Sequence, residues 1–472
     1  MMSVMWSVGI GLFLEVSCSP EHVSFDQPFV INEINSMGND SIELFNRTPF
    51  DFDLTGYTFY SVGEEAGNIP LPEGSVLPSN GYLVLYDSTH GMQLRGEDLI
   101  QMSSPDGAML EEVGWNKDAA KISWCRIPNG FGDFVGCPEA TFGSENIPPS
   151  EETILMTPLW MAGGREGSHV GSNFDDLQEV HVVGDKLWAS DANNYRVQVF
   201  DLTGEIVETV GSAGDSTGEF TPKEQGKVGP ESIGNNSTDQ VFVVDRAGQK
   251  INLYDASSFA PLGEWVSDDF VDPTGLEVDA DDNVFVADQG TDNIYAFDSD
   301  GEMLFSFQVL INNSMKVLSK TETLALYESK RWLLATSENR SQVAVFNIDT
   351  GEWVEGFIGE VQSGEEMQDG RFRDDIEGIA VSEEYGVLFA SDEFNGRILL
   401  FDLESEGIFS ADQDFGYIGS FGRVGEAPGE FLSADGVTVD DERDLLIIAD
   451  QGNHRIQAFS LSALLSALNW SR

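Results

Sequence analysis

Residues 388–402 read LFASDEFNGRILLFD, and residues 446–460 read LIIADQGNHRIQAFS. In both stretches an apolar run ends at an aspartate, a basic residue stands five positions later, and a second apolar run follows. Four more stretches repeat this pattern, beginning at residues 187, 241, 284 and 333. Two apolar runs on either side of a short polar turn are typical of a β-hairpin. The chain therefore contains six related hairpins.

The spacing of these hairpins predicts the fold. The aspartate or its equivalent recurs every 43 to 58 residues, which suits one four-stranded blade of a β-propeller per copy. The last copy lacks room for its outermost strand, and residues 154–174 resemble the stretch that completes other copies. We expect a six-bladed β-propeller over residues 153–463, closed by its first strand, and a tail over residues 464–472 that carries part of a short amphipathic helix.

Two positions of the hairpin recur in the copies. The first holds Asp191, Asp245, Asp288, Ser337, Asp392 and Asp450. The second, five residues later, holds Arg196, Lys250, Asn293, Gln342, Arg397 and Arg455. An aspartate at a turn can accept hydrogen bonds from backbone amides and pair with a nearby basic residue. We therefore expect a structural role for both positions, and the pattern resembles the signature of NHL repeats.

The region before the propeller has a different organisation. Residues 29–147 alternate polar and apolar residues in short runs between turn signals, which predicts a β-sandwich. The stretch INEINSMGNDSIELFNRTPFDFDLTGYTFYS, followed by LPSNGYLVLY and SWCRIPNGFGDF, resembles a lamin-tail domain, an immunoglobulin-like sandwich. This resemblance implies an interaction module over residues 25–147, joined to the propeller by a linker at residues 148–152. The whole chain is thus expected to be all-β, with an immunoglobulin-like β-sandwich followed by a six-bladed β-propeller.

The N-terminus predicts export. Residues 4–14 form an apolar run of signal-peptide length that is too short to span a bilayer permanently. Cys18, at the end of a leader over residues 1–18, resembles the lipidated cysteine of bacterial lipoproteins. The expected location is the outer membrane or cell surface, or the medium if the leader is cleaved without lipidation. In an exported protein, Cys125 and Cys137 are expected to form a disulfide rather than a metal site.

The charge of the chain excludes one class of partner. The sequence has 82 acidic and 24 basic residues and a formal net charge of −58. Such a surface repels nucleic acids and anionic membranes, so we expect no nucleic-acid partner and membrane contact only through a lipid anchor. The acidic residues are spread along the chain. They indicate either a solvated surface or an affinity for divalent cations.

A second repeated position carries the candidate site. Upstream of each hairpin, just before the innermost strand of each expected blade, stand Gln178, Glu231, Thr274, Glu322, Glu377 and Asp435. In a propeller these positions lie near the central channel on one face. Carboxylates that converge there repel one another unless a cation neutralises them, so a calcium site is one interpretation. The other is that each carboxylate caps backbone amides of its own strand.

The stretches DDIEGIAVSEEYGVLFAS and YIGSFGRVGEAPGEFLSADGVTVDDERDLLIIADQGN resemble β-propeller phytases. Those enzymes are six-bladed and use calcium on one acidic face to bind phytate and activate water. The resemblance implies that Asp375, Glu377, Glu322, Glu338 and Asp435 are calcium ligands, and Glu231 joins them from the channel positions. For phosphate binding the first three blades offer only Arg246, although Lys250, Lys330 or Arg331 could compensate.

Two functions follow from the sequence. The leading hypothesis is an exported, surface-anchored modular protein whose calcium-binding propeller recognises a protein, a glycan or a phosphorylated small molecule. The alternative is a calcium-dependent, phytase-type phosphomonoesterase that acts on inositol phosphates. The scarcity of basic residues favours the first hypothesis, and the DIEG and SADG segments favour the second. Whether the protein is an enzyme stays open at this point.

Overall fold

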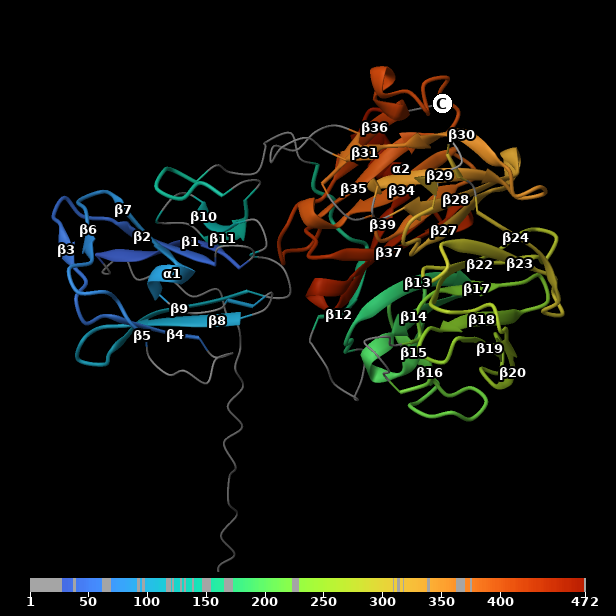
Figure 1. The fold of residues 1–472 in the computed structure, drawn as a ribbon, viewed down its shortest axis with the longest axis horizontal. Coiled ribbons are helices and arrows are strands. Elements are labelled where there is room, and N and C mark those ends of the chain that lie inside the picture. The colour runs from blue at the N-terminus through green and yellow to red at the C-terminus, as the bar shows by residue number, and fades with distance from the viewer. Residues whose placement is uncertain are drawn as a thin grey trace, which may run out of the picture.

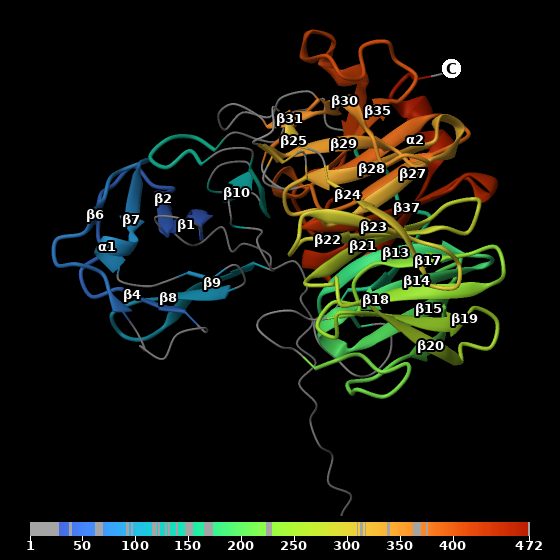
Figure 2. The same ribbon diagram turned by 45° about the vertical axis from the view of Figure 1, so that its right-hand side comes forward.

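The computed structural model describes most of the chain as two β-rich domains (Figures 1 and 2). The only helices longer than one 3-10 turn in these residues are α1 (Asp87–His90) and α2 (Leu461–Ala467), apart from the kinked turn at Ala411–Gly416. No helix in this part of the chain is long and apolar enough to cross a membrane. The described residues are 28–36, 40–61, 69–90, 94–95, 98–115, 120, 123–127, 130, 133–137, 140–146, 154–164, 173–222, 229–308, 310–311, 315–316, 318–337, 340–361, 370–373 and 376–470.

The first domain consists of two main sheets that share one apolar core, as expected for a β-sandwich. Their inward residues include Ile31, Ile42, Phe59 and Ile100, all fully buried or nearly so. A two-stranded ribbon of β3 (Phe52–Asp53) and β6 (Val76–Leu77) lies beside them. One sheet has the order β11 (Asp133–Gly136), β10 (Trp124–Ile127), β1 (Phe29–Asn35), β2 (Ser41–Asn46) and β7 (Tyr82–Tyr86). The other has the order β5 (Ile69–Pro70), β4 (Thr58–Ser61), β8 (Asp98–Ser103) and β9 (Met109–Trp115).

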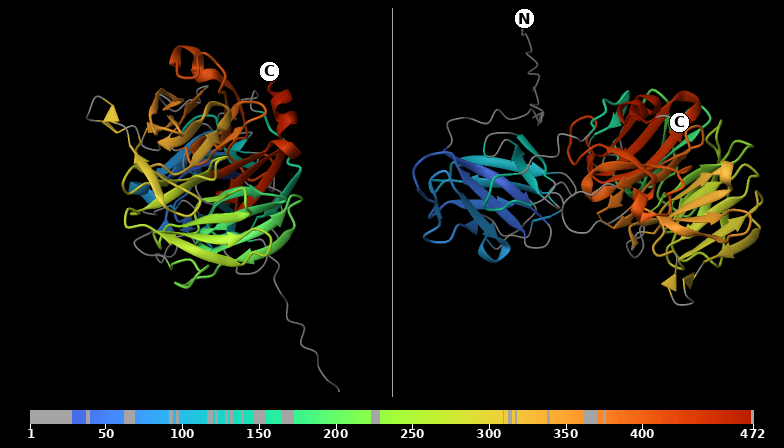
Figure 3. Two further views of the ribbon diagram at one scale, coloured as in Figure 1. Left: turned by 90° about the vertical axis from the view of Figure 1, so that its right-hand side faces the viewer. Right: turned by 90° about the horizontal axis from the view of Figure 1, so that it is seen from above.

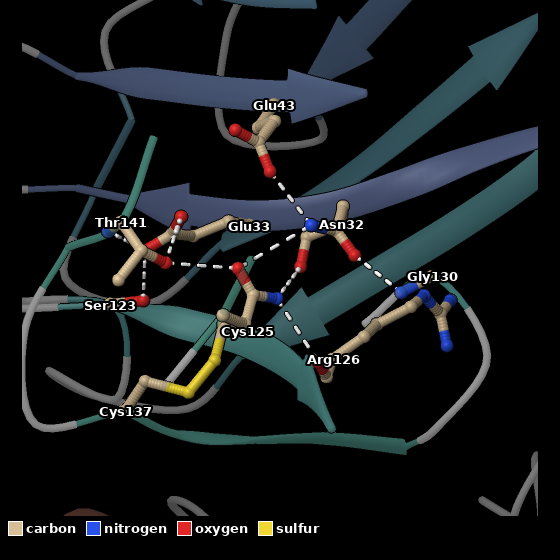
Figure 4. The surroundings of a disulfide bond; sticks show 10 residues. Asn32, Glu33, Glu43, Ser123, Cys125, Arg126, Gly130, Cys137 and Thr141 are labelled. Atoms are coloured by element: carbon tan, nitrogen blue, oxygen red, sulfur yellow. Dashed lines mark hydrogen bonds between the residues drawn. A yellow bond between two sulfur atoms is a disulfide. The ribbon is translucent and has the colours of Figure 1, made fainter. Parts of the chain in front are cut away.

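The predicted disulfide is confirmed. Cys125 on β10 bonds to Cys137 just after β11, with their Cα atoms 6.0 Å apart. Figure 4 shows that it lies beside a buried polar cluster, in which the backbone amide of Thr141 donates to Glu33 at 2.9 Å and Asn32 donates to Glu43 at 2.7 Å. Burial raises the pKa of Glu43 to about 7. The cluster and the disulfide together fasten the end of the sandwich, before the chain continues to the propeller.

The second domain is a ring of six four-stranded antiparallel sheets, which we call blades 1 to 6 (Figure 1). Blade 1 comprises β13 (Leu177–Val183), β14 (Lys186–Asp191), β15 (Arg196–Asp201) and β16 (Ile206–Val210). Blade 2 comprises β17 (Ile233–Asn235), β18 (Gln240–Asp245), β19 (Lys250–Asp255) and β20 (Pro261–Val266). Blade 3 comprises β21 (Pro273–Val278), β22 (Val284–Asp288), β23 (Asn293–Phe297) and β24 (Met303–Phe307).

The remaining blades follow the same plan. Two-stranded ribbons lie between blades, formed by β25 (Leu310–Ile311) with β26 (Met315–Lys316) and by β31 (Glu360–Val361) with β32 (Arg371–Phe372). Blade 4 comprises β27 (Leu324–Tyr327), β28 (Trp332–Ser337), β29 (Gln342–Asn347) and β30 (Trp353–Ile358). Blade 5 comprises β33 (Ile379–Ser382), β34 (Val387–Asp392), β35 (Arg397–Asp402) and β36 (Tyr417–Phe421). Blade 6 comprises β37 (Ala434–Asp440), β38 (Leu445–Asp450), β39 (Arg455–Ser460) and β12 (Trp160–Gly163).

The ring closes as the sequence predicts. Strand β12, from the start of the domain, pairs antiparallel with β39, placing Trp160 opposite Ala458 and Gly163 opposite Arg455. Just before β12, Ile154 forms a parallel bridge with Phe421 on blade 5. The chain therefore passes along two blades before it begins the first, and blade 6 keeps no unpaired outer edge on β39.

The recurring aspartates hold their hairpins together, so their predicted structural role is confirmed. Asp392 accepts the backbone amide of Arg373 at 3.0 Å and the side chain of Arg397 at 2.7 Å. Asp450 accepts the side chain of Arg455 at 2.7 Å in the same way. Blade 2 departs from this pattern, because Lys250 turns to Glu264 on the outer strand at 2.7 Å. The repeat is thus a folding motif, built from contacts between residues close together in the sequence.

Two further contacts bind the edges of the propeller. The predicted C-terminal helix is present as α2, whose residues Leu461, Leu464 and Leu465 pack against blades 5 and 6. On the side of the sandwich, Val424 and Leu432 of the loop between β36 and β37 pack against the sandwich core. Figure 3 shows the two domains side by side. The loop of one blade thus forms part of the boundary between the domains.

Candidate functional site

The predicted calcium-site residues that the structure describes lie at or just before the start of the innermost strands, around one end of the channel. We call this ring of positions the channel mouth. Glu231 is buried, whereas Glu322, Glu377 and Asp435 are partly exposed. Asp375, Glu338 and Cys18 lie outside the described residues. The six positions of the channel mouth are Gln178, Glu231, Thr274, Glu322, Glu377 and Asp435.

On one side of the channel mouth, a single arginine links blades 2 and 3 directly and blade 4 through a glutamine. The guanidinium of Arg246 contacts Asp272 through two hydrogen bonds, of 2.8 and 3.3 Å, and lies 3.3 Å from Glu231. It also donates to the side-chain oxygen of Gln289 at 2.9 Å, and Gln289 in turn donates to Glu322. We call these five residues the Arg246 cluster. Arg246 therefore supplies positive charge where the sequence led us to expect a metal ion.

The electrostatics of the Arg246 cluster follow from its burial. Burial raises the pKa of Glu231 to about 8, against the opposing effect of the Arg246 charge, and the charge of Glu322 raises it further. Burial also opposes the charge of Arg246, but the hydrogen bond to Asp272 and the neighbouring carboxylates raise its pKa above its usual value. Arg246 consequently remains a cation at any physiological pH, and its main ionic partner is Asp272.

The other side of the channel mouth is not part of this cluster. Asp435 accepts a hydrogen bond from Gln451 at 2.8 Å, and the backbone amide of Glu377 donates to Ser391 at 3.2 Å. Within the described ranges, no three or more His, Cys, Asp or Glu side chains come close enough to hold a metal ion. Among the residues that the structure describes, these carboxylates alone therefore do not complete a calcium site.

The DIEG and SADG segments have a packing explanation. A Cβ atom on Gly378 would lie 1.9 Å from the carbonyl oxygen of Asp435 in the next blade, and one on Gly436 would lie 2.8 Å from that of Gln178. A side chain at either position would collide with the neighbouring innermost strand. The glycine after each acidic residue is therefore required by the close approach of adjacent blades around the channel.

The sequence reasoning missed two members of the Arg246 cluster, Asp272 and Gln289. A signal was present, because Arg246 and Gln289 directly follow the recurring aspartates Asp245 and Asp288. Gln451, which follows Asp450, likewise contacts the channel mouth through Asp435. The position after the recurring aspartate thus points its side chain toward the channel mouth in at least three blades.

The other basic candidates for phosphate binding are also engaged by carboxylates. Lys250 lies 2.7 Å from Glu264. Lys330 lies 3.2 Å from Glu404 and donates to a backbone carbonyl. Arg331 lies 2.6 Å from Asp349 and 2.8 Å from Glu328. These positive charges are neutralised within the protein before any ligand arrives.

Comparison with known proteins supports the fold. A family model described as a 6-bladed beta-propeller, DUF5128, matches residues 172–280. No curated protein matches the sequence. Among solved structures, a structural genomics protein of unknown function from Bacteroides thetaiotaomicron is 17% identical, with a TM-score of 0.45, and the match covers 93% of this chain and 99% of that one.

Two more solved structures are similar to part of the chain. Hydrazine synthase from Kuenenia stuttgartiensis is 13% identical, with a TM-score of 0.44, over 62% of this chain and 98% of that one. A catalytically inactive virginiamycin B lyase from Staphylococcus aureus, solved with quinupristin, is 12% identical, with a TM-score of 0.39, over 61% of this chain and 84% of that one. At these identities the chemistry of those proteins does not transfer to this chain. The propeller itself suggests a binding or interaction role.

Proposed function

We propose that this protein is an exported, surface-anchored binding protein, in which the propeller recognises a ligand or partner and the sandwich serves as an interaction module. One observation carries the proposal: Arg246, Lys250, Lys330 and Arg331 are all paired with carboxylates of the protein. A hydrolase of polyphosphorylated substrates needs cationic groups that are available to the phosphates. The resemblance of residues 25–147 to lamin-tail domains supports the interaction role.

Calcium enters this proposal only at the side of the channel mouth formed by Glu377 and Asp435. On the opposite side Arg246 already pairs with Asp272 and lies beside Glu231. The leader and Cys18 support a lipid anchor at the outer membrane or cell surface. Export and lipidation are tested by detergent phase partitioning of the protein expressed in a bacterium, with Cys18→Ala expected to move it from the detergent to the aqueous phase.

The function is tested by incubating the full chain with phytate, with and without added calcium, and measuring released phosphate. We expect no release above the background of a heat-denatured sample in either condition. Robust calcium-dependent release would contradict the proposal and establish the phytase-type alternative. A β-propeller phytase assayed in parallel controls for the substrate and the buffer.

A further inference from the structure

Deeper in the channel, beyond the channel mouth, lies a cavity of about 300 Å³. Its walls come from the innermost strands of all six blades, β13, β17, β21, β27, β33 and β37. It extends to the hairpins that follow these strands, because Ala280, Glu328 and Glu383 also line it. The cavity is thus distinct from the Arg246 cluster and reaches toward the opposite face of the propeller. Its volume is at the lower end of the range for small-molecule sites.

Two carboxylates line this cavity without a basic partner. Glu179 on β13 accepts the backbone amide of Val180 at 2.9 Å, and Glu277 on β21 accepts that of Val278 at 3.2 Å. Neither carboxylate has another hydrogen-bond or ion-pair partner among the described residues. Burial raises the pKa of each to about 8, and the charge of Glu277 adds to the effect on Glu179. We call these two residues the channel pair.

The position of Glu179 is exceptional in the repeat. The residue that follows the channel mouth in the other five blades is always small: Ser232, Gly275, Thr323, Gly378 and Gly436. Two residues further along, Glu277 and His181 stand where the other blades have Gly234, Ala325, Ala380 and Thr438. Blades 1 and 3 therefore bring large polar side chains into the channel, and the small residues of the other blades leave space beside them.

The other residues that line the cavity are apolar, or their polar groups already have hydrogen-bond partners within the protein. Leu326, Val381 and Val439 form an apolar wall on blades 4, 5 and 6. His181 contacts Asn235 at 3.1 Å, and burial lowers its pKa, so it brings no positive charge at neutral pH. No Lys or Arg is present among the described residues that line the cavity.

The other carboxylates of the lining are bound within the protein. Glu328 accepts the backbone amide of Ala280 at 2.8 Å and pairs with Arg331, and Glu383 accepts the amide of Glu328. Asp279 accepts the backbone amides of two residues in its own turn, at 3.0 and 2.8 Å. Only the channel pair is left to meet a cation from outside.

The chemistry of the cavity distinguishes between kinds of cation. Calcium takes six to eight oxygen ligands, and magnesium retains most of its water. Two carboxylates beside an apolar wall do not offer such a shell, in agreement with the lack of a metal-holding group among the described side chains. An organic ammonium ion needs only a few acceptors around its charge, and it brings an apolar body that suits Leu326, Val381 and Val439.

We propose that the cavity binds a compact primary amine, with its ammonium group between Glu179 and Glu277 and its apolar body against blades 4, 5 and 6. This inference rests on the proposed binding function and specifies a site and a ligand class for it. The ammonium group replaces the protons that these partly buried carboxylates would otherwise retain. Binding is non-covalent, and the amine leaves unchanged.

The first test uses the full-length protein and needs no variant. Isothermal titration calorimetry at pH 7.5 compares cyclohexylamine, which is protonated, with cyclohexanol, its neutral counterpart, and with calcium chloride. We expect saturable binding of the amine, at least tenfold weaker binding of the alcohol, and no displacement of bound amine by calcium. Equal binding of amine and alcohol, no binding of the amine, or displacement of the amine by calcium would each overturn the proposal.

The second test assigns the site. Glu179→Gln and Glu277→Gln keep the shape of each side chain and remove its charge, so each is expected to weaken amine binding at least tenfold. Glu208→Gln, on the exposed outer strand β16, is the matched control and should leave the affinity unchanged. Thermal denaturation confirms that each variant is folded. Unchanged affinity in both channel variants would place the amine elsewhere and refute the assignment.

The two proposals fail separately. Phosphate release from phytate would overturn the proposed function without any amine titration. Loss of the amine signal, with no phosphate release, would overturn only the assignment of the cavity. The proposed binding function would then still stand, but with a ligand other than an amine.

Discussion

The Arg246 cluster and the channel pair lie in the same channel, but they differ in how their carboxylates are balanced. The carboxylates of the first have a basic partner in the protein, and those of the second have none among the described residues. At the channel mouth the chain supplies its own cation, so Asp272 and Glu231 are held within the protein. Inside the channel, Glu179 and Glu277 meet only backbone amides of their own strands. Acidic composition alone therefore does not identify a binding site, because the decisive question is which carboxylates the fold leaves without a cation.

Arg246→Met should produce the largest effect, because it removes the cation from the first of the two regions. Asp272 would stay mostly buried and lose its ion pair with Arg246, which is expected to lower the free energy of unfolding by about 3 kcal/mol. Chemical denaturation followed by circular dichroism measures this change. Arg371→Met, whose partner Glu360 is 3.4 Å away and largely exposed, is the control and should cost at most about 1 kcal/mol. Equal losses in the two variants would contradict the structural role of Arg246.

Gly378→Ala tests the spacing of the innermost strands that both regions share. The added Cβ atom would meet the carbonyl oxygen of Asp435, so we expect a loss of about 2 to 3 kcal/mol in the free energy of unfolding. Gly263→Ala, on the outer strand β20, has no atom within 4 Å of the new Cβ and should be almost neutral. If Gly378→Ala is as stable as Gly263→Ala, the DIEG segment owes its glycine to something other than packing.

The channel pair predicts a pH dependence of stability. The pKa values of Glu179 and Glu277 rise from 4.5 to about 8 on folding, so the folded protein binds more protons than the unfolded chain between these values. Their contribution to stability is complete below pH 4.5 and is lost as the pH rises through 8. Glu231 and His181 lie nearby and remain in all variants.

The prediction for the channel pair is therefore tested by measuring the free energy of unfolding as a function of pH for the wild type and for the double variant. Between pH 5 and pH 8, the wild type is expected to lose at least about 2 kcal/mol more of its free energy of unfolding than Glu179→Gln/Glu277→Gln. The exposed variant Glu208→Gln should follow the wild type. Parallel profiles for the wild type and the double variant would mean that the channel carboxylates keep ordinary pKa values.

Calcium should have the smallest effect and act on one side of the channel mouth. At tenfold excess over its dissociation constant, calcium is expected to stabilise the wild type by about 1 kcal/mol, visible as a rise in melting temperature. Asp435→Asn should reduce this rise, and Glu231→Gln should not, because Glu231 lies beside Arg246. If neither calcium nor a chelator moves the melting temperature, the calcium proposal is rejected.

The fold was more predictable than the site. The recurring aspartate and its basic partner act within one hairpin, so six copies leave a pattern that can be aligned, and the ring closure follows from the strand missing after Ser460. The mouth positions stand at or just before the start of the innermost strands, as the alignment of the repeats predicts. Arg246 was recognised as a candidate, but as a phosphate ligand, because its contact with Asp272 crosses from one blade to the next.

The channel pair was overlooked because its significance depends on comparison between distant strands. Glu179 and Glu277 are unremarkable acidic residues in a chain with 82 of them. They become distinctive only when the innermost strands of the six blades are aligned. The alignment shows that the other five blades have Ser, Gly or Thr at the position of Glu179. The size and the apolar wall of the cavity follow from the packing of six strands, which no single stretch of sequence encodes.

The closure of the ring has a consequence for how the protein is made. Strand β12 is synthesised before any other strand of the propeller, but its partner β39 is the last of these strands. Until β39 has been made, β12 lacks the strand it pairs with, so this pairing must wait for nearly the whole domain. A chain that ends before residue 455 lacks β39, so its β12 has no strand to pair with and the ring stays open. The step from open to closed ring therefore requires the last hairpin of the propeller, β38 and β39, and cannot precede its synthesis.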